Sequence, residues 1–125
     1  MARVVVVDDS LAARRQLRQI LEEAGHGVVG EAENGIIAPP LVAALRPDVV
    51  TLDMIMPGRD GLATLHHLKM RNPDLPVVIC SASATERRVL QALRFGASDY
   101  IAKPIEQDRL LRAIDFALEA RLVAA

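Results

Sequence analysis

Strand-like and helix-like segments alternate along the whole chain, and this alternation limits the possible folds more than any other feature of the sequence. Apolar, mostly β-branched runs typical of buried strands occupy five stretches, namely residues 3–8, 27–32, 48–53, 76–81 and 98–102. Helical apolar spacing lies between and after them. Strands separated by helices are typical of parallel βαβ units with right-handed crossovers, so we expect an α/β fold with helices on both faces of one sheet.

Start and stop signals set the expected limits of the helices. Ser10 is a good N-cap for the first helix. Ser83, followed three residues later by Glu86, is a capping-box signature. Proline is tolerated in the first turn of a helix, so Pro39 and Pro40 allow a short second helix. After the first helix, the expected helices span residues 39–46, 61–71, 84–95 and 106–122.

Composition excludes several classes of protein. The 125 residues predict one domain over 1–125, with an aliphatic core because aromatic residues make up only 2%. A net charge of −1 gives no footprint for nucleic acid, and no segment predicts a signal peptide or a membrane span. The single Cys80 excludes an internal disulfide. We therefore expect a cytoplasmic protein with no direct nucleic-acid or membrane partner.

Polar residues end four of the five predicted strands: Asp8, Asp9, Asp53, Ser81 and Lys103. The carboxyl ends of parallel strands share one edge, where open sheets of this class bind their ligands. Each of these residues taken alone also fits a turn, a cap or a solvated side chain. Three carboxylates, one ammonium and one hydroxyl at a shared edge predict a site for a divalent cation and a phosphoryl group.

The charges and positions of these residues indicate which cation would bind and which residue would be the nucleophile. The three carboxylates carry −3 against +1 from Lys103, so a divalent cation would bring the edge to about zero. Hard carboxylate oxygens without nearby His or Cys favour Mg²⁺. Asp53 comes alone from a central strand and is the best candidate nucleophile for an aspartyl phosphate, while Asp8 and Asp9 are placed to hold metal. Ser81 would add a hydrogen bond to the phosphoryl group.

Several motifs in order resemble CheY-like response-regulator receiver domains over essentially the full chain. They are Val7-Asp8-Asp9-Ser10, Leu52-Asp53-Met54-Ile55-Met56-Pro57 with Gly58 and Asp60-Gly61, Ser81-Ala82, and Lys103-Pro104. The resemblance implies a flavodoxin-like doubly wound sheet of five parallel strands in the order 2-1-3-4-5, with five flanking helices. It also implies a cis peptide between Lys103 and Pro104.

The resemblance assigns a role to each site residue. Asp53 would be the phosphoacceptor and a metal ligand, Asp9 a direct Mg²⁺ ligand, and Asp8 a ligand acting largely through water. The backbone carbonyl of Ile55 would complete the protein ligands. Ser81 and Lys103 would contact the phosphoryl group.

The resemblance also implies an output. Tyr100 matches an aromatic switch position whose ring turns inward as Ser81 moves toward the phosphate. The helix at 84–95, the strand at 98–102 and the last helix would then change shape and bind a downstream protein target. The phosphoryl donor would be a histidine kinase or a histidine phosphotransferase of a two-component system of the chemotaxis or phosphorelay type. Apart from phosphorylating and dephosphorylating itself, the protein would not be an enzyme, and we expect a monomer or a weak dimer.

Other functions stay open to different degrees. The chain could be a receiver belonging to a larger regulator, or a receiver-fold scaffold that works without phosphorylation. An aspartyl-phosphate phosphatase would need a second acid at Ile55, and a flavin phosphate would be repelled by Asp8 and Asp9.

Two regions depart from the family pattern. The segment from Ile36 to Pro40 replaces the usual polar start of the second helix. Ile55 and Ser83 occupy positions that tune water access in the family. An apolar Ile55 cannot orient an attacking water, so we predict a long-lived phosphoryl group.

Overall fold

Strands and helices alternate throughout the computed structural model, which describes residues 1–124. The strands are Arg3–Val7 (β1), Gly27–Ala32 (β2), Val49–Leu52 (β3), Val77–Ser81 (β4) and Asp99–Ala102 (β5). The helices are Leu11–Glu23 (α1), Ala38–Leu45 (α2), Gly61–Arg71 (α3), Glu86–Arg94 (α4) and Gln107–Ala124 (α5). All strands pair in parallel in the order β2-β1-β3-β4-β5, so the predicted fold and strand order are confirmed.

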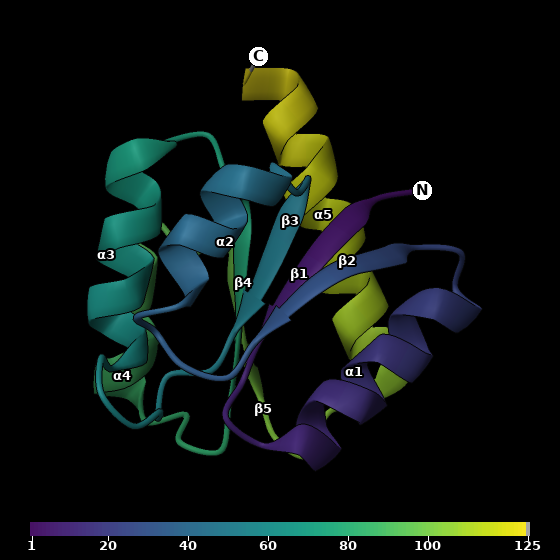
Figure 1. Cartoon of the computed structure of the whole chain (residues 1–125). Coiled ribbons are helices and arrows are strands. Elements are labelled where there is room, and N and C mark those ends of the chain that lie inside the picture. Colours follow the sequence, from purple (N-terminus) through teal and green to yellow (C-terminus); the bar gives the residue numbers. More distant parts are fainter. Residues whose placement is uncertain (125) are drawn as a thin grey trace.

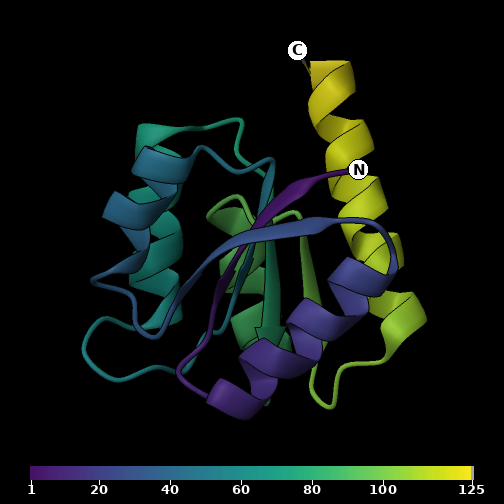
Figure 2. The ribbon, with the colours of Figure 1, turned by 45° about the vertical axis from the view of Figure 1, so that its right-hand side comes forward.

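The helices form one layer on each face of the sheet (Figures 1 and 2). α1 and α5 cover one face, and α2, α3 and α4 cover the other. Val4 and Val6 of β1 belong to the core under α1 and α5, whereas Val5 and Val7 belong to the core under the other three helices. Because successive side chains of a strand point to opposite faces, a strand covered on both sides has to be apolar throughout.

Side-chain caps begin three of the helices. The Ser10 Oγ accepts a hydrogen bond from the Ala13 N–H at 3.2 Å, as expected for an N-cap. The predicted capping box at Ser83 is wrong, because Thr85 is the N-cap of α4 and its Oγ1 accepts from the Arg88 N–H at 3.3 Å. Ser83 instead belongs to the turn after β4, so α4 starts two residues later than predicted.

The second helix tolerates its prolines because both fall in the first turn, where no backbone donor is needed. It ends at Leu45, one residue before the predicted limit. Arg46 adopts a left-handed conformation with φ 49° while its N–H still donates to the Val42 carbonyl at 2.9 Å. Since Arg46 precedes Pro47, helical geometry is disfavoured at Arg46, and the chain turns there instead.

The remaining predictions of local structure agree closely with the structure. β2 and α3 have the predicted limits, and the other limits differ by at most two residues at either end. The Lys103–Pro104 peptide is cis, as the resemblance implied. None of the described helices is both long and apolar enough to cross a bilayer.

Candidate functional site

The carboxyl ends of four strands bring the predicted polar residues to one edge of the sheet. These residues follow or end β1, β3, β4 and β5: Asp8, Asp9, Asp53, Ser81 and Lys103. Backbone hydrogen bonds hold the edge together, because the Asp53 N–H donates to the Val7 carbonyl at 2.9 Å and the Lys103 N–H to the Ser81 carbonyl at 2.8 Å. The convergence predicted from the parallel strands is confirmed.

Three carboxylates form the centre of this edge. Asp8, Asp9 and Asp53 each offer one oxygen, and these oxygens all lie within 4.8 Å of one another. Asp8 and Asp53 are buried, at 1% and 5% exposure, whereas Asp9 is exposed. The cluster therefore opens to solvent on the Asp9 side, which leaves room for a ligand to enter.

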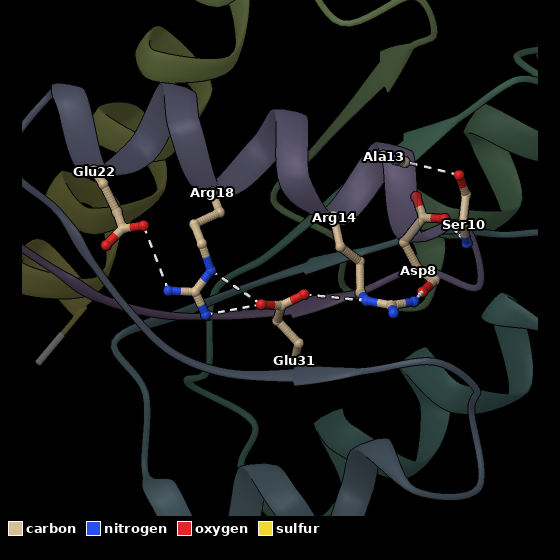
Figure 3. Close-up of polar contacts among 7 residues, drawn as sticks. All are labelled: Asp8, Ser10, Ala13, Arg14, Arg18, Glu22 and Glu31. Atoms are coloured by element: carbon tan, nitrogen blue, oxygen red, sulfur yellow. Dashed lines mark hydrogen bonds and ion pairs between the residues drawn. The ribbon is translucent and has the colours of Figure 1, made fainter.

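Asp8 has a hydrogen-bond partner for every polar group it carries. Its Oδ1 accepts from the Ser10 N–H at 2.9 Å, and its Oδ2 accepts from the Lys103 Nζ at 2.8 Å. On the backbone, its N–H donates to the Ala32 carbonyl at 3.0 Å, and its carbonyl accepts from the Arg14 Nη1 at 2.8 Å (Figure 3). A buried carboxylate with this many partners is rigidly placed.

The buried carboxylate of Asp53 has weaker polar partners than that of Asp8. Its Oδ1 accepts from the Ile55 N–H at 3.2 Å, and the Lys103 Nζ lies 3.4 Å from its Oδ2. Burial raises the pKa of Asp53 above its usual value and the charge of Asp8 adds to this, with the Ile55 N–H and Lys103 opposing both. Burial alone would lower the pKa of Lys103, but its hydrogen bond to Asp8 and the charge of Asp53 outweigh that and raise it.

These residues fit a hard divalent cation. The donor set consists of carboxylate oxygens on neighbouring strand ends, one of them open to solvent, which suits an ion that keeps several waters. The three carboxylates carry a formal charge of −3 and Lys103 returns only +1, so the cluster keeps unbalanced negative charge. A divalent cation at this edge would supply the missing charge.

Ser81 and Tyr100 are linked through Ser83. Ser81 is fully buried, and its Oγ accepts a hydrogen bond from the Ser83 N–H at 3.1 Å. The Tyr100 ring is buried at 8% exposure, and its hydroxyl donates to the Ser83 carbonyl. The loop after β4 is therefore tied to the acid edge at one end and to β5 at the other.

Three isoleucines in the loops after β2 and β3 are exposed. Ile55 lies 51% exposed in the loop after Asp53, while Ile36 and Ile37 are 58% and 43% exposed before α2. A Cβ built on Gly58 would lie 3.3 Å from the Ile36 Cδ1, so Ile36 packs over the loop that carries Ile55. The unusual segment before α2 thus places an apolar side chain against the loop that follows β3.

Two residues help to hold the site in ways that were not predicted from the sequence. The Arg14 guanidinium donates a hydrogen bond to the backbone carbonyl of Asp8. Gly61 starts α3 against the Asp53-Met54 backbone, where an added Cβ would lie 2.3 Å from the Met54 Cα. Glycine directly after the Asp60 cap was the available signal for the second; nothing in the local pattern distinguishes Arg14 from a solvated helix residue.

Comparison with known proteins agrees with this geometry. The family model described as response regulator receiver domain matches residues 4–115. The chemotaxis protein CheY of Listeria monocytogenes is 38% identical over 115 residues, which cover 92% of this chain and 97% of that protein.

Two solved structures have the same fold at similar identity. The signal receiver domain of a modulated diguanylate cyclase from Desulfovibrio desulfuricans has a TM-score of 0.91 at 30% identity, covering 100% of this chain and 99% of that one. CheY in the CheX-CheY-BeF3-Mg complex of Borrelia burgdorferi has a TM-score of 0.87 at 31% identity, covering 90% and 85%. With its acid edge, its strand order and these relatives, the chain belongs to the response regulator receiver domain family.

Proposed function

We propose that this protein is a phosphoryl-accepting switch of a two-component system, in which Asp53 receives the phosphoryl group. The observation that carries the proposal is the single edge at which three carboxylate oxygens lie within 4.8 Å and Lys103 reaches Asp53 at 3.4 Å. The Borrelia relative was solved with BeF3 and Mg, which supports the same ligands here.

In the proposed reaction an Oδ of Asp53 attacks the phosphorus of a phosphohistidine or a small phosphodonor. A new P–O bond forms as the bond to the donor breaks, and the donor leaves with the electron pair of that bond. Mg²⁺, when bound, would neutralise charge on the phosphoryl oxygens. Asp8 and Asp9 would hold the cation, together with Asp53 and the predicted carbonyl ligand of Ile55.

Lys103 and Ser81 would bind the phosphoryl group once it is on Asp53. In the structure Lys103 lies closer to Asp8, at 2.8 Å, than to Asp53, at 3.4 Å. A phosphoryl group on Asp53 adds strong acceptors and up to one further negative charge, which would draw Lys103 toward it. The Ser81 hydroxyl can donate to the same group while its oxygen still accepts from the Ser83 N–H.

Movement of Ser81 would transmit phosphorylation to the protein surface through Ser83 and Tyr100. Ser83 accepts the Tyr100 hydroxyl, so a shift of the loop toward the phosphate changes the position of the ring. The surface beyond it, formed by α4, β5 and α5, includes exposed apolar side chains of α4 and α5: Leu90, Leu93 and Phe116. We propose this surface for a downstream protein target, as CheY of Borrelia is found in complex with CheX.

The lifetime of the phosphoryl group follows from Ile55. Its half-exposed aliphatic side chain has no group that could orient a water for attack on phosphorus. Ile55→Asn, which introduces an amide, should shorten the half-life of phosphorylated protein in a phosphate-release assay. An unchanged half-life would contradict this role, and the predicted tuning role of Ser83 can be tested in the same way with Ser83→Ala.

The test of the proposed function is intact mass after incubation with acetyl phosphate, with and without Mg²⁺. We expect a Mg²⁺-dependent gain of one phosphoryl group that is absent in Asp53→Asn. If no condition produces the gain, the phosphorylation-independent scaffold becomes the better reading. The donor kinase or phosphotransferase, the cytoplasmic location and the monomeric or weakly dimeric state stay predictions.

A second candidate is a receiver that works inside a longer regulator, where it would control a covalently attached output domain. The similarity to a receiver domain of a diguanylate cyclase favours it. The mass of the native protein, detected in its own cells with an antibody against this domain, distinguishes the two. A species of about 13.6 kDa supports the separate switch, and a larger one the longer regulator.

A further inference from the structure

Arg14 on α1 connects three elements next to Asp8 (Figure 3). Its Nη1 donates to the backbone carbonyl of Asp8 at 2.8 Å, and its Nε donates to the Glu31 Oε1 of β2 at 3.1 Å. The side chain is only 13% exposed, so the guanidinium sits in the groove between α1 and the strands. One residue thus links α1, the end of β1 and β2.

The direction of the Asp9 carboxylate depends on the backbone. Asp9 is exposed, and none of the hydrogen bonds and ion pairs within residues 1–124 involves its carboxylate. Its placement within 4.8 Å of the other two acids is therefore set by the peptide group that joins Asp8 to Asp9. Arg14 holds the carbonyl of that peptide, while the Asp8 N–H is fixed by the Ala32 carbonyl.

From this geometry we infer that Arg14 is a positioning residue for cation binding, which holds the Asp8–Asp9 peptide so that Asp9 is aimed at the other two carboxylates before the cation arrives. The inference rests on the proposed function, because it takes the acid cluster to be a Mg²⁺ site. A guanidinium suits this role because its planar fork can bind a carbonyl and a carboxylate at once, which an ammonium does less well.

The rest of the network keeps Arg14 from rotating and provides a control. Glu31 also accepts from the Arg18 Nε at 3.0 Å and Nη2 at 2.8 Å, so the carboxylate is held between two arginines. Arg18 lies one turn farther along α1, and its other ion pair is with Glu22 at 3.4 Å. Arg18 therefore shares the helix, the chemistry and the Glu31 partner of Arg14, but it makes no bond to Asp8.

The charge of Arg14 and its hydrogen bond to the Asp8 carbonyl predict opposite effects on cation binding when Arg14 is removed. If Arg14 acted only through its charge, removing that charge would strengthen Mg²⁺ binding, because a nearby cation repels Mg²⁺. If it acts by orienting the Asp8–Asp9 peptide, removal weakens binding, since residues that orient metal ligands typically contribute about tenfold or more to affinity. The sign of the change alone separates the two explanations.

The experiment measures MgCl2 binding to the metal-free protein by isothermal titration calorimetry, with Mn²⁺ binding by electron paramagnetic resonance as a second readout. Neither depends on phosphorylation. We expect Arg14→Met to weaken binding by about tenfold and the matched Arg18→Met to change it by less than about twofold. Urea unfolding of both variants separates a general loss of stability from an effect on the site. If Arg14→Met fails to fold, Arg14→Lys takes its place, with a smaller loss of affinity expected.

Each outcome decides the inference. Unchanged or tighter binding by Arg14→Met, or an equal loss in Arg18→Met, overturns it while leaving the proposed function intact, provided that the wild type binds Mg²⁺ and is phosphorylated. A wild type that binds neither ion overturns the proposed function and the inference together. Weaker binding confined to Arg14 variants supports the positioning role.

Discussion

Asp53→Asn is predicted to stabilise the metal-free protein at neutral pH, although it removes the proposed phosphoacceptor. Asn has nearly the same shape and can still accept the Ile55 N–H that Asp53 Oδ1 accepts at 3.2 Å. What changes is one buried negative charge. The direction of the stability change therefore depends on whether that charge favours or opposes folding.

The structure allows the size of the effect to be estimated. With an effective dielectric constant of about 20, a second carboxylate oxygen within 4.8 Å repels Asp53 by at least about 3.5 kcal/mol, and Lys103 at 3.4 Å attracts it by about 5 kcal/mol. Repulsion by the exposed Asp9 is screened and smaller. These contributions nearly cancel, so the cost of burying the charge decides the sign. For a site open on one side we expect a net gain of about 1–2 kcal/mol for Asn, or roughly 4–8 °C in Tm.

The pH dependence follows from the raised pKa of Asp53. Below the pKa of an unfolded aspartate the side chain is neutral in both states, and wild type and Asp53→Asn should have similar stability. As the pH rises through that value toward the raised pKa of the folded protein, the wild type loses stability that the variant keeps. Above that pKa the difference in stability between wild type and Asp53→Asn should stay constant. Saturating Mg²⁺ should remove or reverse this difference.

Urea unfolding in EDTA between about pH 3 and pH 8 is the assay, and Asp99→Asn is the control of opposite sign. Asp99 is bound by both terminal nitrogens of Arg109 at 2.9 and 3.0 Å, and these bonds outweigh burial and lower its pKa. Its charge stabilises the fold above its unfolded pKa, so Asp99→Asn should be less stable at neutral pH. If metal-free Asp53→Asn is less stable than wild type at pH 7, the buried charge of Asp53 favours folding and this prediction is wrong.

Three further predictions concern packing. Gly61→Ala should lower the free energy of unfolding by about 2–3 kcal/mol in a urea titration, because its Cβ would lie 2.3 Å from the Met54 backbone. The control is Gly27→Ala, whose Cβ would have no atom within 4 Å and so should cause no clash. Thr51→Val should gain about 1 kcal/mol, since the buried Thr51 hydroxyl has no hydrogen-bond partner among the described residues; a loss would mean that the hydroxyl is satisfied. Burial raises the pKa of the Cys80 thiol to about 12, so a thiol reagent should label it only after denaturation, and fast labelling of native protein would contradict its burial.

Local signals in the sequence predicted most of the fold, for identifiable reasons. The four valines of β1 are buried on both faces, and Ser10 caps α1, as their patterns indicated. The cap of α4 was misplaced, because Ser83 and Thr85 are both suitable caps and the pattern does not say which one the preceding turn uses. Pro47 predicted where α2 ends, but the left-handed conformation of Arg46 depends on how α2 meets β3, which helical spacing does not describe.

Within the site, the pattern of strands and polar residues was enough to predict which groups gather at the carboxyl edge, because polar residues that end parallel strands all lie at that edge. How those groups pair depends on the packing of the whole domain. Lys103 binds Asp8, 95 residues away, more closely than Asp53, and Arg14 binds the backbone of Asp8 rather than water. Such choices depend on distances of a few tenths of an ångström between strand ends and α1. Sheet twist and helix packing set those distances, and no local pattern encodes them.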